Sequence, residues 1–581
     1  MNKNIAVGID LGTSTSEICI FRGKEPQMVS DPGSKSPIVP SLVACNKRGE
    51  LLVGEDARPW VDIPGQGVRE VKRKMGTAEK VRLLDKEYRP EEISAVILKK
   101  LKDNAEQMLG QTIKEVVLSV PANFPDAARQ ATLDAGDLAG LKILRLINEP
   151  TAAALAFGIK NIGSEEQIVV FDFGGGTLDI TVLEMMEGIL DVKASFGDTQ
   201  LGGKDFDEAL IDLIISNFSK QYPGVSIPDR ARAALKGEAE KCKVALTTKP
   251  RYESTVPSFG FMRGDPLDLE IDLSRGQFEE AVGPLLDRAR ECIRQALKAK
   301  KIRPSAIDRV LLVGGTTYIP CVRRLVQEMF GKNPSIDVNP DLAVAMGASV
   351  QAAIATDIIS PEQGVILTDV SPFGLGIPIV TSFGGRDILV YESLINPNTT
   401  IPYSVKKVYS LLHANQDTVD IRLYQDHTGN AKLMEDVKDT GVNASIKKIP
   451  PAPDGKPHPL EIEFSYDVNG IARLEAVIPA TKQRVNLVYS NTGNRMSEED
   501  KIKAKEKVDD LWTKSPLAKR YEGMIEKAKN LVPTLGGDKK TALQTALRDL
   551  LNALASGDNA KSEKAGDFLA DFLFDLETEG R

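Results

Sequence analysis

Two similar stretches, AVGIDLGTSTSEICIF at residues 6–21 and VVFDFGGGTLDITVLE at residues 169–184, constrain this chain more than any other feature. At a constant offset of 162 residues, the matching positions are Asp10 with Asp172, Gly12 with Gly174, Thr15 with Thr177, and Glu17 with Asp179. A second pair of stretches, residues 116–158 and 310–349, repeats the order strand, loop, helix, strand, turn and Ala-rich helix. One α/β fold has therefore been used twice, and we expect a ligand between the two copies.

The glycines of residues 174–176 are predicted to lie in the turn of a β-hairpin, because apolar and polar residues alternate again after Thr177. A Walker loop would need Gly-x4-Gly-Lys-Ser/Thr, which the sequence lacks, and a Rossmann fingerprint would need a helix after its glycines. Backbone N–H groups of a glycine turn can converge on an anion, since no Cβ blocks the approach.

An aspartate precedes each of these turns, Asp10 and Asp172. A carboxylate aimed at a phosphate repels it unless a cation lies between them, so the pattern predicts Mg²⁺ with its water shell. A lone Asp-x-Gly hairpin is usually only a turn. Two in register, with a further glycine pair at Gly314 and Gly315, favour a phosphate site.

Composition narrows the class of protein. The chain has 581 residues, a net charge of −8 and no basic cluster, which indicates several domains and argues against nucleic-acid binding. No run of about 18 apolar residues or secretory leader is present, so we expect neither secretion nor a membrane span. Five scattered cysteines favour a reducing cytoplasm, and because all three histidines lie beyond residue 400, an N-terminal metal must be held by carboxylates.

Four regions follow from the changing pattern along the chain. Residues 1–358 read as the duplicated α/β domain, 359–370 as an interdomain linker, 371–495 as a small antiparallel β-sandwich, and 496–581 as a helical subdomain. The linker carries the apolar run Val365, Ile366 and Leu367, which either docks against another part of the molecule or forms the first strand of the sandwich. An Asn469-Gly470 pair predicts a hairpin turn.

Several motifs resemble one family. GIDLGTSTS, VKRKMG, SVPANFPDAARQATLDAGDLAGL, RLINEPTAAALAFG, FDFGGGTLDI, GDTQLGGKDFDEAL and VLLVGGTTYIP are similar to those of the DnaK-type, seventy-kilodalton heat-shock chaperones, within the actin-like ATPase superfamily. The resemblance covers residues 5 to about 490, as in a shorter, divergent, bacterial-like member. It implies an actin-like ATPase domain with ribonuclease H-like lobes, a β-sandwich that binds unfolded polypeptide, and a helical lid.

The resemblance also implies roles for residues of the ATPase domain. Catalysis is assigned to Asp10, Lys72, Glu149, Asp172 and Thr177. Magnesium waters are assigned to Asp10, Asp172 and Asp179. Contacts with the nucleotide are assigned to Gly12, Thr13, Ser14, Thr15, Gly174, Gly175, Gly176, Thr177, Gly202, Gly203, Glu240, Lys243, Thr247, Gly314, Gly315, Tyr318 and Asp341. On spacing alone, Lys72 would be one of three basic residues on a solvated face, Glu149 could cap a helix, and Glu240 with Lys243 could be a surface ion pair.

Further roles concern communication and substrate binding. Relay and cochaperone positions are Pro121, Arg129, Arg145, Asn148, Val365, Ile366, Leu367 and Asp369. The peptide pocket is assigned to Ile377, Tyr409, Leu412, Val419 and Ile421, any of which could instead be plain core. The implied cofactors are ATP, Mg²⁺ and K⁺, and the implied partners are extended polypeptides, a J-domain cochaperone and a nucleotide exchange factor.

The chain departs from the family pattern at a few places. Lys204 replaces the usual glutamate, Tyr318 replaces an arginine that stacks on adenine in many members, and Val244 stands where some members have another arginine. Residues 76–90 and the helical tail are shorter, and residues are inserted near 378–390. The sequence indicates an ATP-dependent chaperone. A nucleotide-gated scaffold for one dedicated partner and a small-molecule kinase on the same fold are the alternatives.

Overall fold

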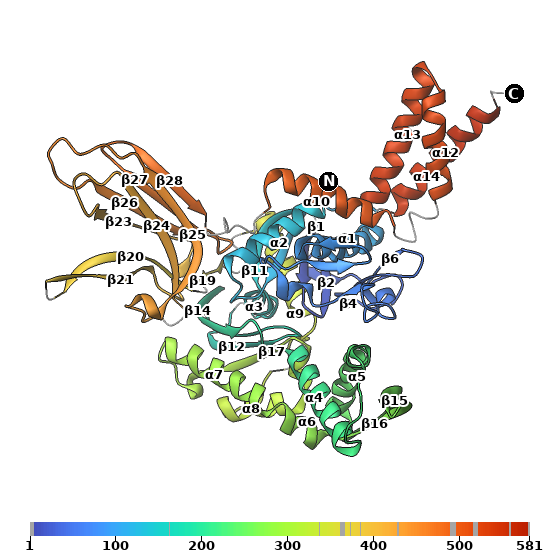
Figure 1. The fold of residues 1–581 in the computed structure, drawn as a ribbon, viewed down its shortest axis with the longest axis horizontal. Helices are drawn as coiled ribbons and strands as arrows, with labels where there is room; N and C mark the ends of the chain where they lie inside the picture. The colour runs from blue at the N-terminus through green and yellow to red at the C-terminus, as the bar shows by residue number, and fades with distance from the viewer. Residues whose placement is uncertain are drawn as a thin grey trace.

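The computed structural model describes residues 5–578 except 162, 187, 336, 361–365, 372, 384, 427–428, 489–495, 515–520 and 557–558. Val365, one of the predicted linker residues, lies outside this part of the chain. Two α/β lobes occupy the centre, a pair of β-sheets stands on one side of them, and a helical bundle stands on the other (Figure 1).

Lobe I is built on a sheet with strand order β11-β10-β1-β2-β3, in which β4 also pairs with β2. Its elements are β1 (Ile5–Leu11), β2 (Thr15–Arg22), β3 (Glu25–Met28), β4 (Val39–Pro40), α1 (Pro90–Leu109), β10 (Glu115–Val120), α2 (Asp126–Leu138), β11 (Lys142–Asn148) and α3 (Glu149–Gly158). Smaller elements are inserted after β4: β5 (Val43–Cys45), β6 (Leu51–Val53), η1 (Gly54–Ala57), β7 (Gly67–Val68), η2 (Val71–Lys74), β8 (Val81–Leu83) and β9 (Lys86–Tyr88).

Lobe II repeats this plan with strand order β17-β12-β13-β14-β18. Its elements are β12 (Glu166–Phe173), β13 (Leu178–Met186), β14 (Ile189–Asp198), α4 (Gly203–Gln221), α5 (Asp229–Thr248), β15 (Arg251–Met262), β16 (Asp265–Ser274), α6 (Arg275–Ala281), α7 (Gly283–Ala299), η3 (Pro304–Ala306), β17 (Arg309–Val313), η4 (Gly315–Tyr318), α8 (Pro320–Phe330) and α9 (Ala343–Ala355). The predicted duplication is present in register, since Asp10 pairs with Glu17 across β1–β2 as Asp172 pairs with Asp179 across β12–β13.

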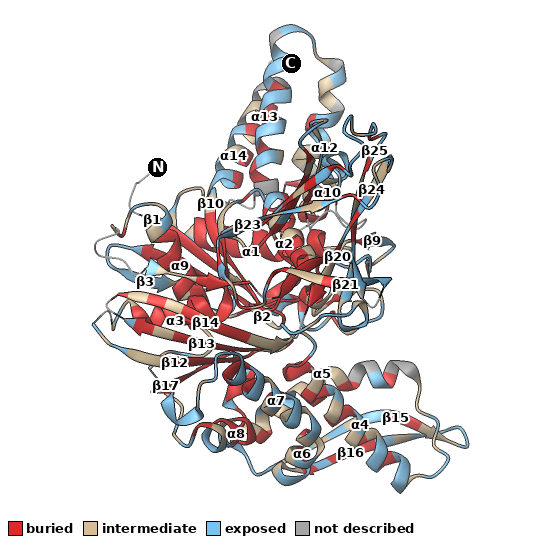
Figure 2. Ribbon diagram, turned by 90° about the vertical axis from the view of Figure 1, so that its left-hand side faces the viewer, coloured by how far each residue is buried: buried red, intermediate tan, exposed pale blue. Residues whose placement is uncertain are grey.

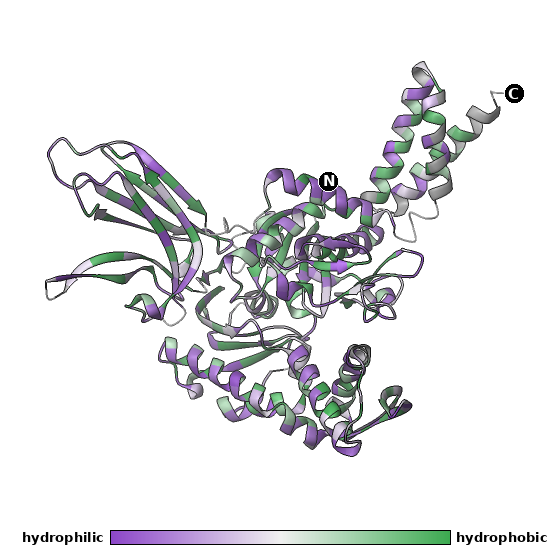
Figure 3. Ribbon diagram, viewed as in Figure 1, coloured by the Kyte–Doolittle hydropathy of each residue, from purple (hydrophilic) through white to green (hydrophobic). Residues whose placement is uncertain are grey.

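Helices cover both faces of the central sheets, which explains why strands such as β12 are apolar and buried along most of their length (Figure 2). The same strands are hydrophobic in Figure 3, whereas the outer helices carry polar residues. Helices α3 and α9 pack against each other between the lobes. A Cβ at Gly347 would lie 1.7 Å from the carbonyl oxygen of Ala152, so only glycine permits this helix contact. The lobes therefore meet along a tightly packed seam.

Two four-stranded sheets follow, with strand orders β21-β20-β24-β25 and β23-β26-β27-β28 and one shared apolar core. Their elements, with the short segments beside them, are β18 (Ile366–Leu367), β19 (Asp369–Val370), β20 (Gly374–Phe383), β21 (Arg386–Ile395), β22 (Thr400–Ile401), β23 (Tyr403–Ser410), β24 (Thr418–Asp426), η5 (Met434–Asp436), β25 (Lys438–Lys447), β26 (Pro459–Tyr466), β27 (Ala472–Ile478) and β28 (Gln483–Val488). The predicted turn at Asn469-Gly470 joins β26 to β27.

The chain ends in α10 (Glu498–Trp512), α12 (Glu522–Leu531), η6 (Val532–Thr534), α13 (Gly537–Ser556) and α14 (Asn559–Thr578). Ser497 caps α10 by accepting a hydrogen bond from the N–H of Asp500, as the sequence predicts. Helix α10 lies on α1 and α2, and Val508, Leu511 and Trp512 join the core of lobe I. Helices α12, α13 and α14 have an apolar core of their own. None of the described helices is long and apolar enough to cross a membrane.

Candidate nucleotide site

The two glycine turns face each other across a cavity of about 380 Å³ between the lobes. The first turn joins β1 to β2 and the second joins β12 to β13, so both are hairpin turns, as predicted. A Cβ added at Gly175 would lie 2.0 Å from Ser14 Oγ, and one at Gly176 would lie 2.5 Å from Thr13 Oγ1. The turns therefore approach so closely that a side chain at either glycine would push them apart.

Nearly all residues predicted to contact a nucleotide line this cavity. They are Asp10, Gly12, Thr13, Ser14, Thr15, Lys72, Glu149, Asp172, Gly174, Gly175, Gly176, Thr177, Gly203, Glu240, Lys243, Thr247, Gly314, Gly315, Tyr318 and Asp341. Two predicted residues lie behind the lining. Gly202 packs against the backbone of Gly175 and Gly176, and Asp179 lies buried beside Asp172 on the neighbouring strand.

Four carboxylates crowd the end of the cavity beside the two glycine turns: Asp10, Glu149, Asp172 and Asp179. Burial, followed by repulsion from the other three, raises the pKa of Asp172 well above its usual range. Burial also raises the pKa of Asp10, of Glu149 and of Asp179. A cluster of this kind is stable in its ionised form only with added positive charge.

Lys72 supplies part of that charge. It projects from η2, is 5% exposed, and forms a buried ion pair with Glu149. Burial alone would lower the pKa of Lys72, but Glu149 and Asp10 outweigh it and raise that pKa, so the ammonium stays charged. The reading of Lys72 as part of a solvated face is therefore wrong. Glu149 begins α3, yet its carboxylate pairs with Lys72 and caps nothing.

The carboxylates also fit a hydrated cation. Asp172 Oδ2 and Asp179 Oδ2 are buried and have no hydrogen-bond partner among the described residues. The remaining oxygens are held in place, since Ser119 Oγ donates to Asp10 Oδ1 at 2.6 Å and Asn123 Nδ2 donates to Asp179 Oδ1 at 2.6 Å. In the described part of the chain, no group of three or more Asp, Glu, His or Cys side chains could bind a metal directly. The oxygens present therefore suit a cation that keeps its waters.

The opposite end of the cavity is formed by α5 and η4. Glu240 pairs with Lys204 at 3.5 Å, whereas Lys243 pairs with Asp207 at 2.8 Å and donates to the carbonyl oxygen of Gly203 at 3.0 Å. The alternative of a surface ion pair between Glu240 and Lys243 is therefore wrong. Lys204 is 8% exposed and is balanced by two carboxylates, Asp207 and Glu240.

Tyr318 and Val244 also line this end of the cavity. The Tyr318 hydroxyl donates to Asp341 Oδ2 at 3.1 Å, and the Arg323 guanidinium lies 5.7 Å from the Tyr318 ring centroid. The hydroxyl and the ring of Tyr318 are therefore both held in place at the edge of the cavity.

Some residues of the site were not assigned a role from the sequence. Ser119 and Asn123 lie in the SVPANF motif, one of those that resemble the family. The structure shows what they do: each donates a hydrogen bond to a carboxylate of the site, Ser119 to Asp10 and Asn123 to Asp179. Thr316 Oγ1 donates to the carbonyl oxygen of Gly174 at 2.8 Å and so connects the two glycine turns of lobe II. Glu17 also lines the cavity, and its place opposite Asp10 was signalled by the duplication.

The predicted relay residues form a buried chain from lobe I to the sandwich. Arg129 Nη2 donates to Asn148 Oδ1 at 2.7 Å, and Asn148 Nδ2 donates to Asp369 Oδ2 at 2.8 Å. Arg129 also donates to the carbonyl oxygens of Pro121, at 3.5 Å, and of Asn469. Arg145 turns instead to Gln351 of α9, at 3.2 Å.

The apolar run of the linker docks on lobe II, as one alternative predicts, and the other alternative, that this run is the first strand of the sandwich, is wrong for Ile366 and Leu367. Ile366 and Leu367 pair in parallel with β14 of lobe II, and the next strand, Asp369–Val370, pairs with β22 of the sandwich. Leu367 packs against the apolar core between the lobes, whereas Ile366 is 59% exposed.

The five predicted peptide-pocket residues have unequal environments. Ile377 and Ile421 are buried in the core of the sandwich, and Tyr409 and Val419 pack against that core while partly exposed. Leu412 is 56% exposed. In this structure, Ile377 and Ile421 are therefore ordinary core residues of the sandwich, which was the alternative to a role in the peptide pocket.

Comparisons with known proteins find relatives over nearly the whole chain. The family model described as Hsp70 protein matches residues 6–571. A protein named Chaperone protein DnaK from Thermotoga petrophila is 39% identical over 579 residues, which cover 96% of this chain and 94% of that protein. Proteins of the same name are 41% identical in Thermotoga neapolitana, over 91% of this chain and 85% of that protein, and 38% identical in Thermosipho melanesiensis, over 96% and 94%.

Proposed function

The chain belongs to the Hsp70 family and is an ATP-dependent molecular chaperone with ATPase activity, and from this premise we propose which of its residues perform each step. Family membership favours the chaperone over the dedicated scaffold and the small-molecule kinase. The observation that carries the assignment of the site is the contact between the glycine turns of two duplicated lobes around one cavity.

We assign the β- and γ-phosphates of ATP to the two glycine turns. Residues 12–15 of lobe I and 174–177 of lobe II line the same cavity, and glycine turns of this kind can offer backbone N–H groups and hydroxyls to an anion. Adenosine then lies toward α5 and η4, where Glu240, Lys243 and Thr247 contact the ribose side and Tyr318 stacks on the base.

Magnesium fits the carboxylates at the phosphate end. Asp10, Asp172 and Asp179 would hold it through its waters, which is supported by the two buried, unpartnered oxygens. When bound, it would offset the negative charge of the triphosphate and of the carboxylates.

Lys72 and Glu149 handle the attack on the γ-phosphate. The ammonium of Lys72 stabilises charge on the transferred phosphoryl group, and Glu149, held by that ammonium, orients the attacking water with help from Thr177. Phosphoryl transfer needs positioning more than covalent catalysis, so buried, mutually held side chains suit this chemistry.

ATP in this cavity favours the arrangement in which linker, sandwich and α10 lie on the lobes. Support comes from the buried chain from Arg129 through Asn148 to Asp369 and from the pairing of the linker with β14. Hydrolysis removes the γ-phosphate contacts that favour this arrangement, and the sandwich then closes on its polypeptide.

The polypeptide binds in extended form beside Tyr409, Val419 and Leu412. The hydroxyl of Tyr409 is buried without a hydrogen-bond partner among the described residues, and a peptide carbonyl would supply that partner once the sandwich opens around it. Leu412 offers an exposed apolar contact.

We propose the partners and the location of this protein from its membership of the family. A J-domain cochaperone would engage Arg145, Asn148 and Asp369, of which Asn148 and Asp369 are 3% and 6% exposed here and become accessible only when the domains separate. An exchange factor and K⁺ complete the proposed set. The five cysteines are free thiols, which suits a reducing cytoplasm.

Substitution of Lys72 by alanine tests the assignment of the site. We expect Lys72→Ala to bind ATP within about tenfold of the wild-type affinity, because the glycine turns remain. Its single-turnover hydrolysis rate should fall by about a hundredfold or more, because the charge beside the γ-phosphate is lost. Hydrolysis at the wild-type rate would refute the assignment.

A further inference from the structure

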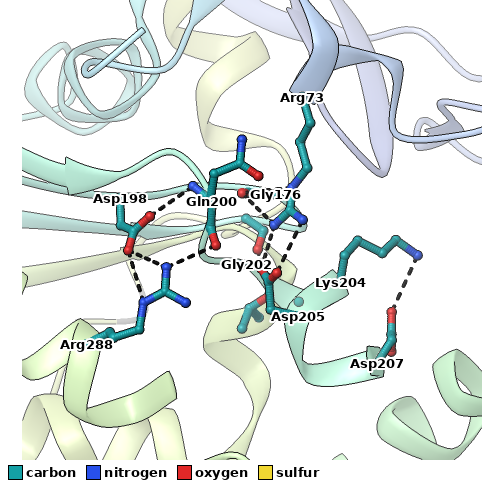
Figure 4. A network of polar contacts seen from close by, with 12 residues as sticks. Arg73, Gly176, Asp198, Gln200, Gly202, Lys204, Asp205, Asp207 and Arg288 are labelled. Atoms are coloured by element: carbon teal, nitrogen blue, oxygen red, sulfur yellow. Dashed lines mark hydrogen bonds and ion pairs between the residues drawn. The ribbon is translucent and has the colours of Figure 1, made fainter. Parts of the chain in front are cut away.

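Arg73, the residue after Lys72, crosses from lobe I to the glycine turn of lobe II. Its side chain donates two hydrogen bonds to the carbonyl oxygen of Gly176, from Nη2 at 2.8 Å and from Nε at 3.2 Å. The same guanidinium forms an ion pair with Asp205 on α4 (Figure 4). Arg73 does not line the cavity, so it reaches the turn from outside.

Asp205 belongs to a short segment that supports the glycine turn from behind. Its Oδ2 accepts a hydrogen bond from the N–H of Gly202 at 2.6 Å and so closes the first turn of α4. From this helix start, the N–H groups of Gly203 and Lys204 donate to the carbonyl oxygens of Gly174 and Gly175, at 3.0 and 2.9 Å. Arg73 of lobe I thus contacts both the turn and its support.

The geometry of the peptide bond gives this contact a consequence. The carbonyl of Gly176 and the N–H of Thr177 belong to one planar trans peptide and point to opposite sides. When Arg73 holds the carbonyl outside the cavity, the N–H of Thr177 points away from Arg73, and Thr177 lines the cavity. Release of the carbonyl would remove the two hydrogen bonds by which Arg73 fixes the orientation of this peptide.

We propose that Arg73 is a positioning residue that fixes the Gly176–Thr177 peptide toward the γ-phosphate and does so only when lobe I is closed on lobe II. This inference rests on the proposed location of ATP. Closure of the lobes and formation of the phosphate cradle are then one event, and opening the lobes both releases the nucleotide and relaxes the cradle.

The neighbouring residue provides a matched control. Lys74 lies on the same short helix, η2, and its side chain is 40% exposed and pairs with Glu79 within lobe I. Lys74→Met therefore removes a basic residue from the same helix without touching lobe II.

We would measure ATP affinity, the single-turnover hydrolysis rate and ADP dissociation in Arg73→Met, Arg73→Lys and Lys74→Met full-length proteins. For Arg73→Met we expect ATP hydrolysis to be about tenfold slower or more, and ADP release to be about tenfold faster. The affinity for ATP should change by a smaller factor than the hydrolysis rate. Arg73→Lys keeps a charge for Asp205 but has no fork to hold the carbonyl as well, so ADP release should recover while hydrolysis stays slow. Lys74→Met should behave as the wild type.

Two results would overturn the inference. One is hydrolysis within about twofold of the wild type in Arg73→Met, the threshold below which a lost positioning contact would be negligible. The other is hydrolysis of ATP at the wild-type rate by Arg73→Lys. If Arg73→Met does not fold, the hydrolysis rate of Arg73→Lys alone tests whether Arg73 positions the peptide. Either result would leave the assignment of the site intact as long as Lys72→Ala is inactive, so the two failures are distinguishable.

Discussion

Ile421 and Leu412, both assigned to the peptide pocket, have opposite exposures. Ile421 is 4% exposed in the sandwich core, and Leu412 is 56% exposed. We expect Ile421→Ala to lower the free energy of unfolding of the sandwich by about 2–4 kcal/mol, because it leaves a cavity. Leu412→Ala should change stability by no more than about 0.5 kcal/mol and weaken peptide binding about fivefold. Denaturant unfolding and peptide titration measure the two effects, and equal destabilisation by both variants would contradict the assigned environments.

For single residues, the sequence shows which side chains are basic, but it does not show what surrounds each of them in the fold. Lys72, Arg73 and Lys74 are consecutive basic residues, yet one is buried with Glu149, one crosses to the other lobe and one is exposed. A short 3-10 helix directs successive side chains to different sides, and nothing in three basic letters reveals which partners lie there. The resemblance predicted the role of Lys72 but assigned none to Arg73.

Among the elements, the linker strand offers the sharpest comparison. Leu367 packs on the core between the lobes, whereas its neighbour Ile366 is 59% exposed. Leu367→Asp should abolish the acceleration of peptide release by ATP, because a charge placed against the apolar core between the lobes prevents docking of the strand. Ile366→Asp, the matched control, should retain most of that acceleration. Stopped-flow peptide release measures both, and identical behaviour of the two variants would contradict the docked register.

The contact between α2 and β27 predicts a pH dependence. Asp126 Oδ1 accepts a hydrogen bond from the N–H of Ala472 at 3.0 Å, and burial raises the pKa of Asp126 from 3.8 to about 7 despite that bond and Arg129, with Asp467 raising it further. Separation of the domains returns this carboxyl to water, so the docked arrangement binds the extra proton. Docking should therefore strengthen by up to about tenfold per pH unit as the pH falls below about 7, and be insensitive above it.

Trp512 reports this equilibrium, because it is buried where α10 meets lobe I. In a Trp60→Phe background, its emission with ATP measures docking between pH 8 and pH 6. Asp126→Asn keeps an acceptor for Ala472 and removes the titration, so its docking should depend less on pH than that of the parent. Equal dependence in parent and variant would contradict the proposed linkage.

The hairpins, the duplication and the Asn469-Gly470 turn follow from sequence because each is specified by neighbouring residues. The contacts between distant elements do not. Pairing of β18 with β14 and burial of Trp512 in lobe I depend on surfaces that are assembled only after each region folds. Local pattern carries little information about such contacts.

For the whole molecule, linker, sandwich and α10 all lie on the two lobes in this structure (Figure 1). The linker, the sandwich and α10 each contact the lobes through different residues, and all three contacts are present together. We therefore treat the docked state as one global arrangement, which a ligand in the cavity can favour or disfavour. The exact domain limits that the sequence predicts, at residues 358, 370 and 495, remain predictions.

The most direct test of the account is the dissociation rate of a fluorescent leucine-rich peptide from the full-length protein with ATP and with ADP. A coupling free energy of about 1–3 kcal/mol between the two sites predicts weaker affinity and release about tenfold faster or more with ATP. Equal dissociation rates and equal affinities with the two nucleotides would contradict the claim that ATP between the lobes controls the hold of the sandwich on its polypeptide.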